Sequence, residues 1–395
     1  MPARPLVTVV IPAYNAAGKI ETALHAACSQ TYRDLEVVVV DDGSTDDTAE
    51  RVMAAADRDA RIRLVQQSNR GVAAARNHGI RVARGSFIAP LDHDDLWLPS
   101  KIERQVASLD ALGPAAGMAY TWWASIDAGD EVLGLAGTWR LCGNVADALV
   151  HLNFIGNASV PLFRRDVVER VGGYSCSLKE RGGQGCEDWD LTLRVAERSL
   201  CAVVPAYLTG YRASQASMSS RTDQMAASFE AMLHDVAHRR PDLSRQMLDY
   251  ARGHFYHYIA AKAFMAGHSK QMFRHIAQCV RHDPARALIP HLWRISLLTG
   301  VAWGKRRRLH RRSLPPLQLE DVNRMSEAER LDVFGPPRWE RPRWRWLPFD
   351  WIHDWRWRRS CQQCANLDHP EALHPSEPVG TTEEKPSPGI VAPSA

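Results

Sequence analysis

The chain has 395 residues, of which 45% are hydrophobic and 24% charged, and its formal net charge is +4. These values are typical of a globular protein and exclude a wholly disordered one, and the length is enough for one large domain or two ordinary ones. The small net charge carries little information by itself, so the positions of the basic residues matter more.

The N-terminus favours a first strand over a targeting segment. Leu6 to Ile11 is apolar but too short for a signal peptide, and it ends at Pro12. Eight cysteines without a regular framework indicate reduced thiols, and hence a cytoplasmic protein. Cys361 and Cys364 have the spacing of a zinc or redox pair, but without a second pair the favoured interpretation is chance spacing in a loose tail.

Apolar runs alternate with helical patterns over the first 110 residues. Strands are expected at 7–11, 35–40, 62–65 and 87–91, with helices after Gly18, after Ser44 or Thr45, and over 72–83. Strand and helix in alternation predict right-handed crossovers. The expected fold class is therefore α/β, with a Rossmann-like, mostly parallel sheet flanked by helices and with its loops gathered at one edge.

Carboxylates follow two of these strands. Asp41 and Asp42 end the second, and Asp92, Asp94 and Asp95 follow the fourth. Ligands bind at the carboxyl ends of parallel strands, and clustered carboxylates repel one another unless a cation lies between them. The sequence therefore predicts a Mg²⁺ or Mn²⁺ site here, the alternative being a solvated acidic turn before a helix.

The pattern is less regular after residue 111. We expect strands at 120–123 and 157–163, a hairpin turn at Gly129-Asp130, and a short helix at 166–171. A glycine-rich loop at 182–185 then precedes Glu187, Asp188 and Asp190, which begin another helix. These acids are either ordinary first-turn caps or functional groups behind a mobile lid.

Together these motifs resemble a family 2 glycosyltransferase of the GT-A fold over roughly the first 220 residues. Five segments occur in the family's order: Val9 to Asn15, Asp41 to Thr45, Gly71 to Gly79, Leu91 to Asp95, and Glu187 to Asp190 followed by Leu193-Arg194. The resemblance implies an inverting, metal-dependent enzyme of the hexosyltransferase type that uses a nucleotide-sugar donor. It also implies a saccharide or lipid-linked acceptor, in the synthesis of cell-surface polysaccharide or glycolipid.

The resemblance also assigns roles to individual residues. Pro12, Tyr14, Asp42, Arg76 and Asp92 would line the donor pocket. Asp94 would bind the metal and Asp188 would be the catalytic base, and we keep Glu187, Asp190 and Arg212 as further possible site residues. In chemical terms, a cation stabilises the leaving diphosphate and a carboxylate on the opposite face of the sugar deprotonates the acceptor hydroxyl, which inverts the anomeric centre.

The sequence departs from the family pattern after the base helix. Ser214 stands where family members commonly have a histidine thought to help with the metal or diphosphate. Arg212 could still face the phosphates, or it could have a structural role at the surface. The alternative function is therefore a catalytically weakened scaffold that binds nucleotide-sugar or membrane partners. No short motif specifies the sugar or the acceptor.

The C-terminal half is expected to be helical over 221–300, where His254 and His257 are interpreted as packing rather than metal-binding residues. An apolar stretch at 287–303 is followed by six basic residues between 305 and 312 and then by interleaved tryptophan and arginine up to residue 359. This order favours reversible contact with an anionic cytoplasmic membrane face, the alternatives being packing on the catalytic domain and, least favoured, stacking on nucleic acid.

The expected organisation therefore has four parts. A catalytic domain covers 1–220, with a nucleotide-binding half at about 1–110 and an acceptor half at about 111–220. A helical region covers 221–300 and a basic Trp/Arg-rich segment 301–360. A disordered tail rich in Pro, Ser, Glu and Thr covers 361–395.

Overall fold

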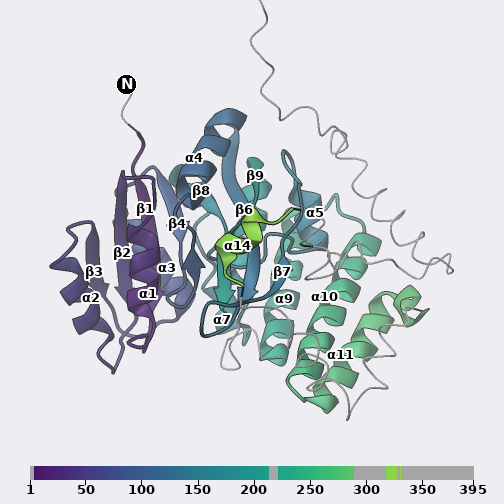
Figure 1. Ribbon diagram of the computed structural model, residues 1–395. Helices are drawn as coiled ribbons and strands as arrows, with labels where there is room; N and C mark the ends of the chain where they lie inside the picture. The colour runs from purple at the N-terminus through teal and green to yellow at the C-terminus, as the bar shows by residue number, and fades with distance from the viewer. Residues whose placement is uncertain (1–3, 213–220, 289–316, 327–329, 331–395) are drawn as a thin grey trace, which may run out of the picture.

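A computed structural model describes residues 4–212, 221–288, 317–326 and 330 of the chain. Its centre is one mixed sheet with the strand order β3-β2-β1-β4-β8-β6-β9-β5, to which β7 adds by pairing with β6. Figure 1 shows the sheet running from β3 at one end of the molecule towards the helices α9 to α11 at the other.

The first half of the sheet is parallel, as expected. Its strands are β1 (Val7–Ala13), β2 (Leu35–Asp41), β3 (Ile62–Gln66) and β4 (Phe87–Pro90), all paired in parallel. The intervening helices are α1 (Ile20–Cys28), α2 (Thr48–Ala56) and α3 (Val72–Val82). β1 is buried along its whole length, which explains its unbroken apolar sequence.

The second half contains both parallel and antiparallel pairs. β5 (Leu96–Trp97) pairs antiparallel with β9 (Leu200–Arg212), whereas β6 (Ala116–Ile126) runs parallel to β9. β8 (Leu162–Arg164) joins the two halves by pairing antiparallel with β4 and β6. β7 (Val132–Ala136) forms the expected hairpin with β6, and Asp130 in its turn has a φ of 66°. Helix α4 (Lys101–Leu112) packs on β6 and β9.

The prediction of a strand at 157–163 is largely wrong. Residues 157–161 do not continue β8 but form a turn, in which the Asn157 side chain accepts a hydrogen bond from the Ser159 N–H at 3.1 Å. Asparagine competes with strand pairing in this way because its carboxamide can bond the backbone two residues on. The turn places Ser159 beside the loop that carries Asp92, Asp94 and Asp95, which we call the acidic loop.

Short helices complete the second half. They are α5 (Ala146–His151), α6 (Arg165–Arg170), α7 (Ser177–Glu180) and α8 (Glu187–Ala196). Gly172 and Gly173 both have positive φ after α6, as expected for glycines that end a helix. The loop at 182–185 is not loose: Gln184 N donates to the Gln224 carbonyl at 3.1 Å, and a Cβ on Gly183 would lie 2.4 Å from the Ser228 Cα.

Helices also form the described part of the C-terminal half. They are α9 (Thr222–Arg239), α10 (Arg245–Met265), α11 (Ser269–His282) and the 3-10 turn η2 (Pro284–Leu288). A single apolar cluster contains Val10, Phe163, Phe229 and Ile276, so the core is continuous across residue 220. Both His254 and His257 contact the guanidinium of the buried Arg286, at 3.3 and 3.4 Å, which fits a packing role.

A final segment, residues 317–326, returns to the sheet. Its helix α14 (Leu319–Arg324) buries Leu319 and Val322 completely against the cluster that contains Tyr207. The Asn323 side chain exchanges two hydrogen bonds with the backbone of Tyr207, at 3.0 and 2.7 Å. Within the described residues no helix is long and apolar enough to cross a membrane. The remaining basic and Trp/Arg-rich positions, and Cys361 and Cys364, lie outside these residues.

Candidate active site

The carboxyl ends of the parallel strands meet at one edge. Ala13 is in register with Asp41, and Asp41 with Gln66, so the loops after β1, β2 and β3 lie together. Asp42 is buried there and accepts hydrogen bonds from the Arg70 N–H at 2.8 Å and the Gly71 N–H at 2.7 Å. Its carboxylate therefore fixes the turn that starts α3, and its contact with a donor stays a prediction.

Tyr14 lies at the rim of this edge. Pro12 is buried as part of β1, but the Tyr14 side chain is 48% exposed. The following residue, Asn15, has a φ of 50° and accepts a hydrogen bond from the Thr45 N–H at 2.8 Å. This contact joins the loops after β1 and β2 and leaves an aromatic ring open to a ligand.

The acidic loop is held by the buried Asp95 and by Ser159, to which sequence reasoning gave no role. Ser159 accepts a hydrogen bond from the Asp92 N–H at 3.0 Å and donates one to the Asp95 carboxylate at 2.6 Å. Asp95 also accepts from the Arg212 N–H at 2.9 Å. Burial, with the charges of Asp92 and Asp94 adding to it, raises the pKa of Asp95 well above its ordinary range. Asp95 thus supports the loop, whereas nothing in the sequence marks Ser159.

Arg212 is buried and joins three segments. Its Nε donates to the Asp94 carbonyl at 2.7 Å, and its terminal nitrogens bond the Asp127 carbonyl and the Asp130 carboxylate in the β6–β7 hairpin. The structural role considered for this arginine is therefore present, although in the interior and not at the surface. Its contact with phosphates remains a prediction.

Asp94 is the acid of this loop that keeps its carboxylate open. Its side chain is 26% exposed, and its nearest cation is the Lys19 ammonium at 3.8 Å. Within the described residues no group of three or more His, Cys, Asp or Glu side chains is arranged to hold a metal ion. The donor set nevertheless fits Mg²⁺ or Mn²⁺, which are commonly bound by one or two carboxylates together with substrate phosphates and water.

Arg76 links the acidic loop to the helix of the candidate base. It is buried on α3, and its Nη2 lies 2.5 Å from an Asp92 carboxylate oxygen. Its guanidinium carbon lies 5.1 Å from the ring centroid of Tyr174, which sequence reasoning missed. The Arg76 Nε is buried and has no acceptor within the described residues. A buried, incompletely paired guanidinium beside a carboxylate is suited to bind an anionic ligand.

Asp188 stands at the start of α8, where its Oδ1 accepts a hydrogen bond from the Trp189 N–H at 2.8 Å. Burial raises the pKa of Asp188 to about 7, and the charge of Arg76 opposes this shift while those of Glu187 and Asp92 add to it. A carboxylate whose pKa is close to the working pH is suited to general base catalysis.

The two neighbouring acids have other partners. Glu187 accepts a hydrogen bond from the Gly185 N–H at 2.8 Å. Asp190 pairs with Arg194 at 2.6 Å, and Arg194 also donates to the Val171 and Gly173 carbonyls, so this pair fixes α8 to the turn after α6.

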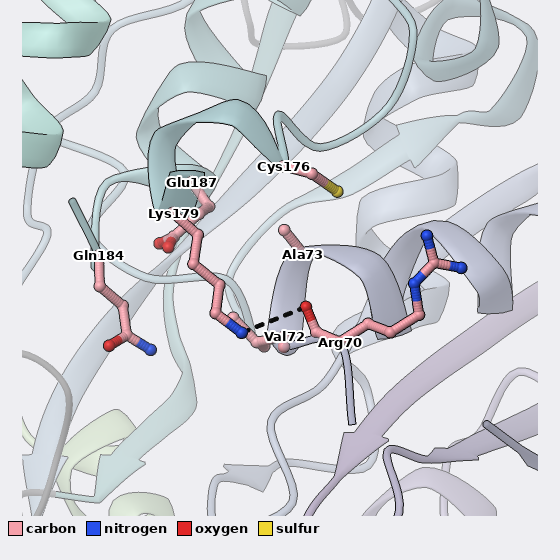
Figure 2. A pocket seen from close by; sticks show the side chains of 8 residues that line it. Arg70, Val72, Ala73, Cys176, Lys179, Gln184 and Glu187 are labelled. Carbon is pink, nitrogen blue, oxygen red and sulfur yellow. Dashed lines mark hydrogen bonds between the residues drawn. The ribbon is translucent and has the colours of Figure 1, made fainter. Parts of the chain in front are cut away.

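A pocket lies between the start of α3 and the segment before α8 (Figure 2). The Lys179 side chain crosses it towards the Arg70 carbonyl, which its ammonium reaches at 3.4 Å, and Gln184 and Glu187 line the other wall. Gly71 has a φ of 92°, a backbone conformation that other residues adopt only with strain, so glycine is favoured there. The space between the start of α3 and the start of α8 is therefore lined in part by polar groups, next to the candidate base.

Comparison with known proteins relates the N-terminal third of the chain to a known family. Residues 8–136 match the model of glycosyl transferase family 2. An Escherichia coli UDP-Glc:alpha-D-GlcNAc-diphosphoundecaprenol beta-1,3-glucosyltransferase, WfaP, is 39% identical over 102 residues, 26% of this chain and 40% of that protein. E. coli chondroitin synthase is 41% identical over 99 residues, 25% of this chain and 14% of that protein. An uncharacterized glycosyltransferase of Rickettsia typhi, RT0329, is 37% identical over 123 residues, 31% of this chain and 38% of that protein.

The match thus covers well under half the length of each of these relatives. Among solved structures, S. aureus TarS 1-349 superposes with a TM-score of 0.51 at 17% identity, over 74% of this chain and 88% of that one. At this identity the likeness concerns the fold alone. It confirms the expected GT-A architecture, a curled and mostly parallel sheet flanked by helices and followed by a helical region.

Proposed function

We propose that the chain, whose residues 8–136 match the model of glycosyl transferase family 2, is a member of that family and transfers a sugar from a nucleotide-sugar donor to a hydroxyl acceptor with inversion. The observation that carries the proposal is the convergence of Asp92, Arg76 and Asp188. They come from a strand end and two different helices, and the charges of Arg76 and Asp92 both act on the Asp188 carboxylate.

In this mechanism Asp188 takes the proton of the acceptor hydroxyl as the new glycosidic bond forms. Arg76 holds Asp92 towards the donor and places a positive charge beside it. A divalent cation held by Asp94 would neutralise charge on the departing nucleoside diphosphate. Tyr14 and Asp42 would contact the nucleoside from the loops after β1 and β2.

We further propose a role in polysaccharide or glycolipid synthesis. WfaP and chondroitin synthase, by their names, make products of these kinds, which supports the proposal. We propose a division into a catalytic domain at 1–220, a helical region at 221–300 that shares its apolar core, and a segment at 301–360 that contacts an anionic membrane from the cytoplasm. Figure 1 shows α9 to α11 at the end of the sheet opposite β3.

The test is nucleotide release from a panel of UDP-, GDP- and dTDP-sugars in the presence of Mn²⁺. We expect one donor to be consumed, and consumption to cease when the cation is chelated. A protein that binds a nucleotide-sugar without releasing nucleotide under any of these conditions would instead be the weakened scaffold that Ser214 suggested. Ser214 itself lies outside the described residues.

A further inference from the structure

The turn at 171–174 is bonded to both of the helices that carry Arg76 and Asp188. On the α3 side, the Asn77 carboxamide exchanges two hydrogen bonds with the backbone of Tyr174. Its Nδ2 donates to the Tyr174 carbonyl and its Oδ1 accepts from the Tyr174 N–H, both at 2.8 Å. Asn77 directly follows Arg76 on α3. The turn is therefore fixed to the residue next to Arg76.

On the α8 side, Arg194 holds the same turn. Its guanidinium donates to the Val171 carbonyl at 2.6 Å and to the Gly173 carbonyl at 2.7 Å, and Asp190 orients it at 2.6 Å. Gly173 has a φ of 69°, and a Cβ there would lie 2.5 Å from the Asn77 Oδ1, so both the backbone and the close approach favour glycine. One short turn thus joins α3 to α8.

The Tyr174 side chain connects this turn to the site itself. Tyr174 is 3% exposed, and its ring centroid lies 5.1 Å from the guanidinium carbon of Arg76. Arg76 is equally buried and pairs with the Asp92 carboxylate. A guanidinium within about 6 Å of a ring centroid is attracted to the ring, and more strongly where water is excluded. The ring and the carboxylate together therefore fix the position of the Arg76 charge.

The position of this charge matters for Asp188. Burial raises the pKa of Asp188, and the charge of Arg76 is the largest influence that opposes the increase. The other titratable groups that interact with this carboxylate are Glu187 on α8, Asp92 in the acidic loop, and Cys186 and Tyr174, which burial keeps neutral. Of these groups Arg76 alone is positively charged. A displacement of its guanidinium would therefore change how readily Asp188 accepts a proton.

We propose that Asn77, Tyr174 and Arg194 are positioning residues, which join α3 to α8 and hold the Arg76 guanidinium in a fixed position relative to the Asp188 carboxylate. The inference rests on the proposed function, in which Asp188 is the base, and adds to it the residues that set the surroundings of that base. Asn77 and Arg194 both lie in segments that carry the family resemblance, although the resemblance assigned neither of them a role.

The experiment measures unfolding free energies from pH 4 to pH 9 for pairs of full-length chains, one with Asp188 and one with Asp188→Asn. Within a pair, the difference in stability grows with pH while the folded chain keeps the proton. It levels off near the folded pKa of Asp188, which is about 7 in the parent.

The pairs are made in the parent and in Tyr174→Leu, Tyr174→Phe and Asn77→Ala. Leucine removes the ring but keeps its surroundings apolar, whereas phenylalanine keeps the ring. Asn77→Ala removes both hydrogen bonds to the turn. Ile276→Ala is the control for a general loss of stability, because Ile276 is buried in the same apolar cluster as Tyr174 but lies on α11.

We expect the difference to level off roughly one pH unit higher in Tyr174→Leu and Asn77→Ala than in the parent, because the Arg76 charge then acts less on Asp188. Tyr174→Phe and Ile276→Ala should level off at the parental pH. The parental pH in Tyr174→Leu, a lower pH in that variant, or the same rise in Ile276→Ala overturns the inference. Unfolding needs neither donor nor turnover, so the expected rise in a chain that releases no nucleotide would contradict the proposed function and leave the positioning role standing.

Discussion

Replacing Asp188 with asparagine should stabilise the protein at neutral pH while it removes activity. Burial raises the pKa of this carboxyl to about 7 in the folded chain, against about 3.9 when unfolded. Between these two values the folded state holds a proton that the unfolded state has lost. The stability of the parent therefore falls as the pH rises from about 4 to about 7, by at most about 1.4 kcal/mol per pH unit.

The size of the stability change follows from the interval between the folded and unfolded pKa values of Asp188. Three pH units give a ceiling of about 4 kcal/mol. Because the Asp188 side chain keeps some contact with solvent, we place the gain from asparagine at about 1 to 3 kcal/mol above pH 7, and near zero at pH 4. Turnover should fall by roughly 10² to 10⁴-fold, since the amide cannot accept the proton.

Chemical denaturation of the parent and Asp188→Asn at pH 4, 5.5, 7 and 8.5 measures this difference. Asp110→Asn is the control, because the Asp110 side chain is 60% exposed and should give a small difference at every pH. Parallel stability curves for the parent and Asp188→Asn would show that the pKa of Asp188 is not raised. Parental turnover in Asp188→Asn would make Glu187 or Asp190 the next candidate base.

The other predictions concern Asp94 in the acidic loop, the buried Arg212, Asn323 in the segment 317–326, and membrane binding by residues 305–308. Asp94→Ala should lose Mn²⁺-stimulated donor binding in calorimetry while its melting curve stays parental, because Asp94 lies at a loop edge; equal stimulation in both proteins would refute the assignment. Arg212→Leu should lose about 1 to 3 kcal/mol of unfolding free energy, since it leaves the Asp94 and Asp127 carbonyls and the partly exposed Asp130 carboxylate without their donor, whereas an unchanged denaturation midpoint would contradict this. Asn323→Ala should lose about 1 to 3 kcal/mol with Arg324→Ala, 79% exposed, as the neutral control. Reversing the charges of 305–308 should weaken co-sedimentation with phosphatidylglycerol vesicles at low salt by about 1 kcal/mol per residue; parental binding would argue against membrane contact there.

The sequence predicted best those elements whose residue pattern directly reflects their burial in the fold. Short β-branched runs that end at turn residues favour strands buried on both faces. The positions of β1 and β2, and of the carboxylates after β2, therefore follow from the residue pattern. Ser159 could not be found in this way, because its role depends on a turn that brings it to Asp92 from 67 residues away. The same holds for Asn323, which reaches Tyr207 across 116 residues. Long-range polar contacts of this kind leave no periodic signal.

The anomeric configuration of the first sugar released from an α-linked donor tests the central claim most directly. With water as the acceptor, ¹H NMR distinguishes the free α and β anomers before they interconvert, so the acceptor need not be known. Single displacement with Asp188 as base predicts the β anomer from the parent, and no enzymatic release from Asp188→Asn. Initial release of the α anomer, or release of the β anomer by Asp188→Asn at the parental rate, would contradict the account.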